Sequence, residues 1–356
     1  MSGLRPIGKL LLTGVPGWLT EALLDDLARS PRNGLSAVRC LVQRNPEFDD
    51  RSFVARHALD LEIVSGDLRD AESLRTAVQG VDTVLHAAGI LHVRRTREWY
   101  DINTDGTEAL ARTAAATGVQ RFVFVSSNAA AGRAPSMNRL MTELDPPRPL
   151  SHYGRSKLLA EQKLVALSSR LETVVIRPCM FYGPPVPKRH LEIYRRILYG
   201  RMPLVGGGQY ARSLTHVDNL MQGCELAMTH PRAVGQTYYI ADRAAYTTRQ
   251  VVDSMAEALG TSPRYLRLPA LIGTLAYHVD SFLSLMGRYW QTVHLVGESN
   301  WHVGVSCEKA CRELGYEPRM ALREGMRQAI DWCVSRGLLH RTLDRYQNSG
   351  ASQHRC

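Results

Sequence analysis

The sequence predicts an α/β protein in which a doubly wound parallel sheet is followed by a smaller, mainly helical C-terminal part. Short apolar runs alternate with helical stretches over the first 180 residues, and a glycine turn lies between the first run and the first helical stretch. After Pro178 the chain changes to shorter elements and loops rich in glycine and proline, such as FYGPPVPKRH. This alternation of strand and helix signals predicts a parallel sheet with helices on both faces.

Six apolar runs have the length and composition of buried strands. They show little polar alternation, which is typical of parallel strands covered on both faces. Right-handed crossovers between such strands give the doubly wound arrangement. The expected strands are residues 9–14, 37–44, 61–67, 81–89, 120–127 and 172–178. The expected helices between them are residues 20–29, 71–79, 106–118 and 157–170.

We expect three regions: a sheet domain at residues 1–180, a second region at 181–340 and a polar tail at 341–356. Segments near 214–250 are expected to return to the first region. The stretch at 268–287, LPALIGTLAYHVDSFLSLMG, predicts a buried helix or a lid over a cavity, because it lacks the cationic polar face of a membrane-surface helix. The last apolar segment predicts two helices joined at GYEP.

Composition argues against several classes of protein. The 44% hydrophobic and 22% charged residues are typical of a globular chain, and no uninterrupted apolar run is long enough to predict a membrane span. No signal-peptide pattern opens the sequence, so we expect a cytoplasmic protein. The seven cysteines are scattered, which predicts neither disulfides nor a metal site. The net charge of +10 comes mostly from arginines spread along the chain, so nucleic acid is not an expected partner.

The first turn has the spacing of a dinucleotide-binding loop. Residues 13–20 read TGVPGWLT, in which Gly14 and Gly17 fit the first two glycines of such a loop. Glycine allows the backbone to approach a pyrophosphate at the N-terminus of the following helix. Trp18 is the next expected cofactor contact, and Thr20 takes the third glycine position. Between a strand and a helix, this turn predicts a Rossmann-type domain.

The end of the second strand indicates which cofactor is bound. Enzymes that use NAD usually place an acidic residue there to hold the ribose 2′-hydroxyl. Here the strand ends VQRN, with no acid until Glu47. Arg44 would instead face a 2′-phosphate, so the sequence favours NADP, with NAD as the alternative.

Further motifs follow in a fixed order along the chain. They are SGDL at 65–68, HAAG at 86–89, DINTDGT at 101–107, FVSSNAAAG at 124–132, SHYGRSK at 151–157, RPCMFYGP at 177–184 and RSLTHVDN at 212–219. In this order they resemble the extended short-chain dehydrogenase/reductase family, also called the NAD-dependent epimerase/dehydratase family. The resemblance covers about residues 8 to 338.

The resemblance implies catalytic roles for Ser127, Tyr153 and Lys157, with Ser126 as a neighbouring substrate contact. Residues i and i+4 of a helix share one face, so Tyr153 and Lys157 can reach one ligand. An ammonium group nearby would lower the pKa of the phenol, which is otherwise near 10. Asn103 matches a family asparagine that is more often structural than catalytic. The remaining cofactor contacts that the resemblance implies are Asp67, Leu68, Ala87, Ala88, Gly89, Pro178, Tyr153 and Lys157.

The expected reaction is reversible hydride transfer between a nicotinamide cofactor and a ketone, aldehyde or secondary alcohol, with Tyr153 as general acid or base. The chain is similar to the 3β-hydroxysteroid dehydrogenase and dihydroflavonol reductase branches, which implies an apolar, steroid- or flavonoid-like substrate. The apolar segment 268–287 favours this interpretation. The resemblance also implies a homodimer formed around the helix that carries Tyr153.

Two alternatives stay open. A nucleotide-sugar epimerase or dehydratase would use Arg212 to bind a diphosphate, since that arginine stands four residues before His216 in RSLTHVDN. Against it, Cys179, Met180 and Phe181 replace polar residues that several sugar enzymes use. The second alternative is a regulator that binds NADP without catalysis, because a fold alone does not establish a function.

Overall fold

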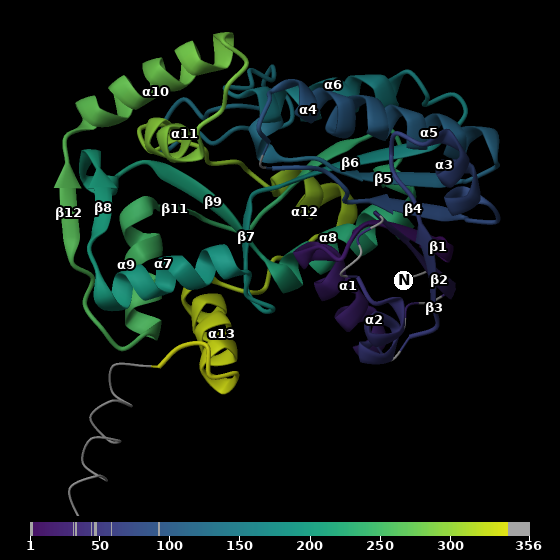
Figure 1. Cartoon of the computed structure of the whole chain (residues 1–356), viewed down its shortest axis with the longest axis horizontal. Helices are drawn as coiled ribbons and strands as arrows, with labels where there is room; N and C mark the ends of the chain where they lie inside the picture. Colours follow the sequence, from purple (N-terminus) through teal and green to yellow (C-terminus); the bar gives the residue numbers. More distant parts are fainter. Residues whose placement is uncertain are drawn as a thin grey trace, which may run out of the picture.

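The computed structural model describes residues 3–340 apart from residues 31, 33, 44, 46, 47, 58 and 92. It confirms the predicted α/β fold: seven parallel strands form one sheet, with helices on both faces (Figure 1). In the order in which they lie side by side, the strands are β10 (Thr237–Ile240), β6 (Glu172–Pro178), β5 (Arg121–Val125), β4 (Thr83–His86), β1 (Gly8–Val15), β2 (Leu35–Val42) and β3 (Leu61–Ser65). The six strands expected from the sequence are all present, and β10 comes from the second half of the chain.

Successive residues of the central strands enter two different cores. On β1, Leu10 and Leu12 belong to one buried cluster, whereas Leu11 belongs to the other. On β5, Val123 belongs to the same cluster as Leu10 and Leu12, and Phe122 belongs to the same cluster as Leu11. This burial on both faces explains why the strands lack polar alternation in the sequence. Helices α1 (Trp18–Arg29) and α8 (Val217–Thr229) cover one face, and α3 (Ala71–Val78), α5 (Thr107–Ala116) and α6 (His152–Val165) cover the other (Figure 1).

The chain beyond β6 builds a smaller part, mainly helical, beside the carboxyl ends of the main strands (Figure 1). It holds two short sheets, made of β7 (Met180–Tyr182), β9 (Ala211–His216) and β11 (Ala245–Thr247), and of β8 (Met202–Val205) and β12 (Tyr265–Leu268). Its helices are α7 (Lys188–Tyr199), α9 (Thr248–Ala258), α10 (Ala270–Leu285), α11 (Gln291–Glu298), α12 (Glu308–Leu314) and α13 (Leu322–Ser335). Of these, α12 packs against β10 of the main sheet. Elements that the sequence did not predict are α2 (Asp50–Arg56), α4 (Arg97–Trp99) and a π-helical turn (Tyr100–Gly106).

Two expectations for the C-terminal part have different outcomes. The two helices joined at GYEP are confirmed as α12 and α13. The segment 268–287 is helical, but the expectation that it is buried is wrong, since Gly273 is the only buried residue of α10. Most of its leucines and its phenylalanine lie exposed, because the neighbouring α11 covers only one of its sides. The predicted tail at 341–356 lies outside the described residues.

Within the described ranges, no helix has the length and apolar character that crossing a bilayer requires.

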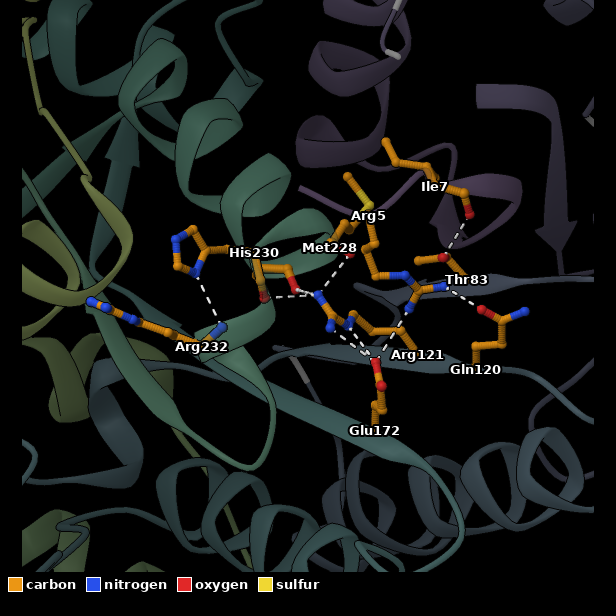
Figure 2. A network of polar contacts seen from close by, with 10 residues as sticks. Arg5, Ile7, Thr83, Gln120, Arg121, Glu172, Met228, His230 and Arg232 are labelled. Atoms are coloured by element: carbon orange, nitrogen blue, oxygen red, sulfur yellow. Dashed lines mark hydrogen bonds and ion pairs between the residues drawn. The ribbon is translucent and has the colours of Figure 1, made fainter. Parts of the chain in front are cut away.

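Arg121, at the start of β5, ties the main sheet to the C-terminal end of α8 (Figure 2). Its buried guanidinium donates hydrogen bonds to the carbonyl oxygens of Met228 and His230, both at 3.0 Å, and pairs with Glu172 at 2.9 Å. The last carbonyls of a helix have no partner within the helix, and a cation there also complements the helix dipole. Arg121 therefore supplies bonds that the α8 backbone cannot make for itself.

We predict that Arg121→Met lowers the free energy of unfolding by about 2–3 kcal/mol, since it leaves buried carbonyl oxygens without donors. Urea denaturation followed by circular dichroism measures this change. The control is Arg75→Met, because Arg75 forms an exposed ion pair with Glu72 on α3; there we expect a change below about 0.5 kcal/mol. Equal effects of the two substitutions would contradict the proposed tie.

Candidate active site

The predicted glycine turn lies at the carboxyl ends of β1 and β4, where the strand order reverses. Doubly wound sheets have a ligand-binding crevice at such a point. Gly14 has a φ of 89°, and a Cβ there would lie 2.8 Å from the backbone of Ala87 and Ala88. A Cβ at Gly17 would lie 2.3 Å from the carbonyl oxygen of Gly14. Both positions therefore require glycine, and the turn presents its backbone at the N-terminus of α1.

A buried histidine links the strand ends beneath this turn. His86 Nδ1 lies 2.7 Å from the hydroxyl oxygen of Thr13, and its Nε2 lies 2.9 Å from that of Thr107. Burial lowers the pKa of His86 to about 3, so the neutral ring accepts on one nitrogen and donates on the other. The Thr13 hydroxyl also accepts the Ala88 amide at 3.2 Å. The HAAG segment is thus fixed next to the glycine turn.

Asn103 connects the HAAG segment to the helix that carries the predicted catalytic pair. Its Oδ1 accepts the Ile90 amide at 2.8 Å, and its side-chain amide donates to the Ser156 hydroxyl at 3.3 Å. A Cβ at Gly89 would lie 3.1 Å from both Asn103 Oδ1 and Lys157 Nζ. Gly89 therefore lets three segments meet within one small volume.

Tyr153 and Lys157 lie one turn apart on α6, whose N-terminus is capped by the Ser151 hydroxyl. The buried Lys157 ammonium donates a hydrogen bond to the Val125 carbonyl oxygen at 3.1 Å. Burial lowers the pKa of Lys157 to about 8, and the charge of Glu161 acts in the opposite direction. The amine can therefore change its charge near physiological pH more readily than an exposed lysine.

Ser127 lies beside the hydroxyl of Tyr153. Burial raises the pKa of Tyr153 to about 12, while a hydrogen bond with Ser127 and the charge of Arg189 lower it. The Ser127 hydroxyl also accepts the Ala129 amide at 3.2 Å in the turn after β5. The structure thus brings the predicted Ser127, Tyr153 and Lys157 together at the crevice.

Ser126 lies next to this group, but its hydroxyl is already engaged. It donates a short hydrogen bond of 2.5 Å to the Glu161 carboxylate, which forms a buried ion pair with Arg177. Ser126 is itself buried. The geometry therefore gives Ser126 a role in linking β5 to α6, where the sequence suggested a substrate contact.

Arg212, the predicted diphosphate ligand, is held by the protein itself. Its guanidinium donates to the Glu298 carbonyl oxygen at 2.9 Å and to the Thr248 hydroxyl at 3.3 Å. Burial lowers its pKa, and Glu298 raises it. To bind a diphosphate, Arg212 would have to share or release these partners.

The residues predicted for the adenosine side of the cofactor lie at the ends of β2 and β3. The Asp67 carboxylate pairs with Arg69 at 2.6 Å and accepts a hydrogen bond from Gln43 at 3.2 Å, and the Arg69 bonds lower its pKa to about 2. Leu68 is buried. Arg44, the basis of the NADP expectation, lies outside the described residues.

Trp18 and Pro178 lie at the junction of the two parts of the chain. The Trp18 indole stacks on Phe181 at 5.0 Å and meets His190 edge-on at 5.8 Å. Its indole N–H is covered, so the contribution of Trp18 to a bound phosphate would come from its backbone amide in the first turn of α1. Pro178 ends β6 and pairs with Ile240 of β10.

These residues fit a nicotinamide dinucleotide. A cofactor can approach the backbone closely at Gly14, Gly17 and Gly89, where an added side chain would collide with its neighbours. The first turn of α1 would hold the pyrophosphate, and Lys157 would reach the ribose beside the nicotinamide. No side chain outside this set is needed to line the backbone cradle.

The comparison with known proteins agrees with this geometry. The model of the "NAD dependent epimerase/dehydratase family" matches residues 10–241, which include nearly all of the main sheet and helix α6. The chain belongs to this family.

Relatives in this family carry out different reactions. The UDP-glucose 4-epimerase of Vibrio cholerae is 29% identical over 90% of this chain and 93% of its own. The 4-hydroxy-2-methyl-3-oxo-4-farnesyl-3,4-dihydroquinoline-1-oxide ketoreductase of Stigmatella aurantiaca is 29% identical over 89% of this chain and 94% of its own. Among solved structures, MoeE5 in complex with UDP-glucuronic acid and NAD matches with a TM-score of 0.72 and 26% identity, over 93% of this chain and all of that one.

Sequence reasoning missed two residues at the site. Trp99 packs edge-on against Tyr153 with ring centroids 6.5 Å apart. Arg189, in the first turn of α7, has a charge interaction with Tyr153, and its side chain makes no hydrogen bond or ion pair with another described residue. Neither residue lies in a motif with recognisable spacing, although the basic run KRH after a proline-rich loop marks the position of Arg189.

We predict that Gly14→Ala weakens binding of NADPH or NADH roughly tenfold or more, equivalent to about 1.4 kcal/mol, because the new methyl pushes the turn away from Ala87 and Ala88. Titration calorimetry measures the affinity. Gly118→Ala is the matched control, since Gly118 has a φ of 85° with nothing within 4 Å of an added Cβ. Both variants bear similar backbone strain, so an equal loss of affinity would show that close approach at Gly14 is irrelevant.

Proposed function

We propose that the protein is an NADP-dependent oxidoreductase, with NAD as the alternative cofactor, that interconverts a ketone or aldehyde and a secondary alcohol. The observation that carries this proposal is the meeting of Ser127, Tyr153 and Lys157 at the crevice where the dinucleotide turn lies. The absence of an acid at the end of the second strand up to Glu47 supports NADP.

In the reductive direction, Tyr153 acts as the proton donor. Its raised pKa keeps the phenol protonated at neutral pH, so the proton is available to a carbonyl oxygen. The Ser127 hydroxyl holds that oxygen beside the phenol. When bound, the nicotinamide supplies or accepts hydride at C4. In the oxidative direction, the Lys157 ammonium favours the phenolate that takes the proton from the alcohol.

An apolar substrate is supported by the surroundings of the tyrosine. Trp99 lies against Tyr153, and Tyr289 packs edge-on against Trp99 at 4.8 Å. Aromatic rings this close to the tyrosine are compatible with a ring-bearing ketone such as a steroid or flavonoid. The farnesyl-quinoline substrate in the name of the Stigmatella relative is also largely apolar. The expected cytoplasmic location and the expected homodimer are both compatible with this proposal.

A nucleotide sugar is the second candidate, and Arg189 favours it. This arginine faces Tyr153 without an acidic partner among the described residues, so it can pair with an anionic group of a substrate. The names of the Vibrio relative and of the MoeE5 complex include uridine-diphosphate sugars. In this case Tyr153 would take the proton of a sugar hydroxyl, and hydride transfer to the cofactor would oxidise the sugar transiently.

We predict that Tyr153→Phe lowers turnover of carbonyl substrates at least 100-fold, because general acid catalysis contributes about 10²–10⁴. Oxidation of NADPH in the presence of steroid and flavonoid ketones gives the rate. Binding of NADPH should stay measurable, which separates loss of chemistry from loss of folding. Tyr265→Phe is the control, since its hydroxyl bonds to Asp253 in the smaller part. Full turnover by the Tyr153 variant would overturn the proposal.

Thermal unfolding with added ligands decides between the two substrate classes. We expect NADPH to raise the unfolding temperature, because a ligand at 100 times its Kd adds about 2.7 kcal/mol to the free energy of unfolding. We expect UDP to leave the unfolding temperature unchanged, because the proposed substrate is an apolar ketone. Copurified NAD together with stabilisation by UDP would instead favour the nucleotide-sugar enzyme. Arg189→Ala should then remove the UDP response.

A further inference from the structure

Helix α10 turns an apolar stripe toward solvent. Residues spaced three or four apart lie on one face of a helix, and here that face is apolar and exposed along its whole length. Its members are Leu271, Leu275, Val279, Phe282 and Leu285, with exposures of 65%, 56%, 48%, 62% and 87%. Met286, Trp290 and Leu295, which follow in the chain, are also exposed. We call the five residues of α10 the apolar stripe.

The opposite face of α10 is the one that packs on the protein, through Gly273, Asp280 and Tyr277, whose ring meets that of Trp301 edge-on at 5.5 Å. Asp280 accepts a hydrogen bond from His294 of α11 at 2.8 Å. Gly273 lies against Asn300, and Gly297 lies against the backbone of Tyr277. A surface helix ordinarily turns its apolar face inward. The folding of this chain therefore does not account for the apolar stripe. Helix α10 itself lies at the outer edge of the molecule (Figure 1).

Arginines stand at both ends of the stripe. Arg264 and Arg267 on and next to β12 precede α10, and Arg288 follows it. The loop that holds Arg94 and Arg95 lies at the same end as Arg288, because the Thr96 amide bonds to the Gly287 carbonyl oxygen at 3.3 Å. All five arginines are exposed, and none forms an ion pair with another residue that the structure describes.

We propose that the apolar stripe docks on the surface of an anionic phospholipid bilayer. An interfacial helix buries an apolar face at the boundary of headgroups and acyl chains, while basic residues beside it pair with anionic headgroups. The five arginines supply the charge complementarity at both ends of α10. A second copy of the chain fits this face less well, because pairing the stripes of two copies would bring arginines against arginines.

Docking would bring the membrane close to the proposed site. Tyr289 lies between Arg288 and Trp290 and packs on Trp99, which in turn packs on Tyr153. If the proposed function holds, docking would place an apolar ketone dissolved in the bilayer close to the part of the molecule that carries Tyr153. The docking itself rests only on the stripe and the arginines.

Cosedimentation of the full chain with vesicles tests the proposal. We expect binding to vesicles that contain the anionic lipid phosphatidylglycerol, and much weaker binding to vesicles of pure phosphatidylcholine. The double variant Leu275→Asp/Phe282→Asp should lower the partition coefficient at least tenfold. Leu144→Asp is the matched control, because Leu144 is 95% exposed elsewhere on the surface, and it should bind like the unmodified chain.

Two further variants test the contribution of the arginines and separate docking from activity. Arg264→Ser/Arg267→Ser should lower binding about fivefold for each arginine and reduce its dependence on salt. Tyr153→Phe should bind vesicles normally, so that loss of activity cannot be mistaken for loss of docking. The proposal is overturned if the unmodified chain ignores anionic vesicles or if the Asp variant binds equally well. It is also overturned if light scattering shows a dimer that the Asp variant dissociates, since the stripe would then be a contact between copies.

Discussion

The rest of the structure depends on the burial of the central strands from both faces. Because Leu10, Leu11 and Leu12 alternate between two cores, β1 cannot shift or turn over without exposing one set to water. The strands are thereby fixed in register, and their carboxyl ends form one edge. The glycine turn, the HAAG segment and Ser127 lie at that edge.

At this edge, close packing of the backbone takes the place of long side chains. The glycine turn meets the HAAG segment at Gly14, and the same segment meets α6 at Gly89. The neutral His86 and the amide of Asn103 connect these segments by hydrogen bonds. A buried lysine can then be kept beside a buried tyrosine, because its ammonium has a carbonyl partner and the tyrosine has a serine partner.

The smaller part of the chain is attached to the sheet by a few contacts. It is held to the sheet by β10, by α8 with its Arg121 tie and by Trp18 stacked on Phe181. Its outermost helices contribute little to the core and leave an apolar surface in solvent. Most of the buried core therefore belongs to the sheet, while the outer helices of the smaller part add mainly surface.

Patterns of short range were enough to predict the six sheet strands before β7, the glycine turn and the pairing of Tyr153 with Lys157, because strand period, glycine geometry and helix spacing are local properties. Contacts between distant segments were decided only by the tertiary structure. Ser126 and Arg212 looked available in sequence, yet Glu161 and the Glu298 carbonyl engage them. Arg189 and the outward stripe of α10 had no local signature, since exposure and charge partners depend on which surfaces the folded chain leaves uncovered.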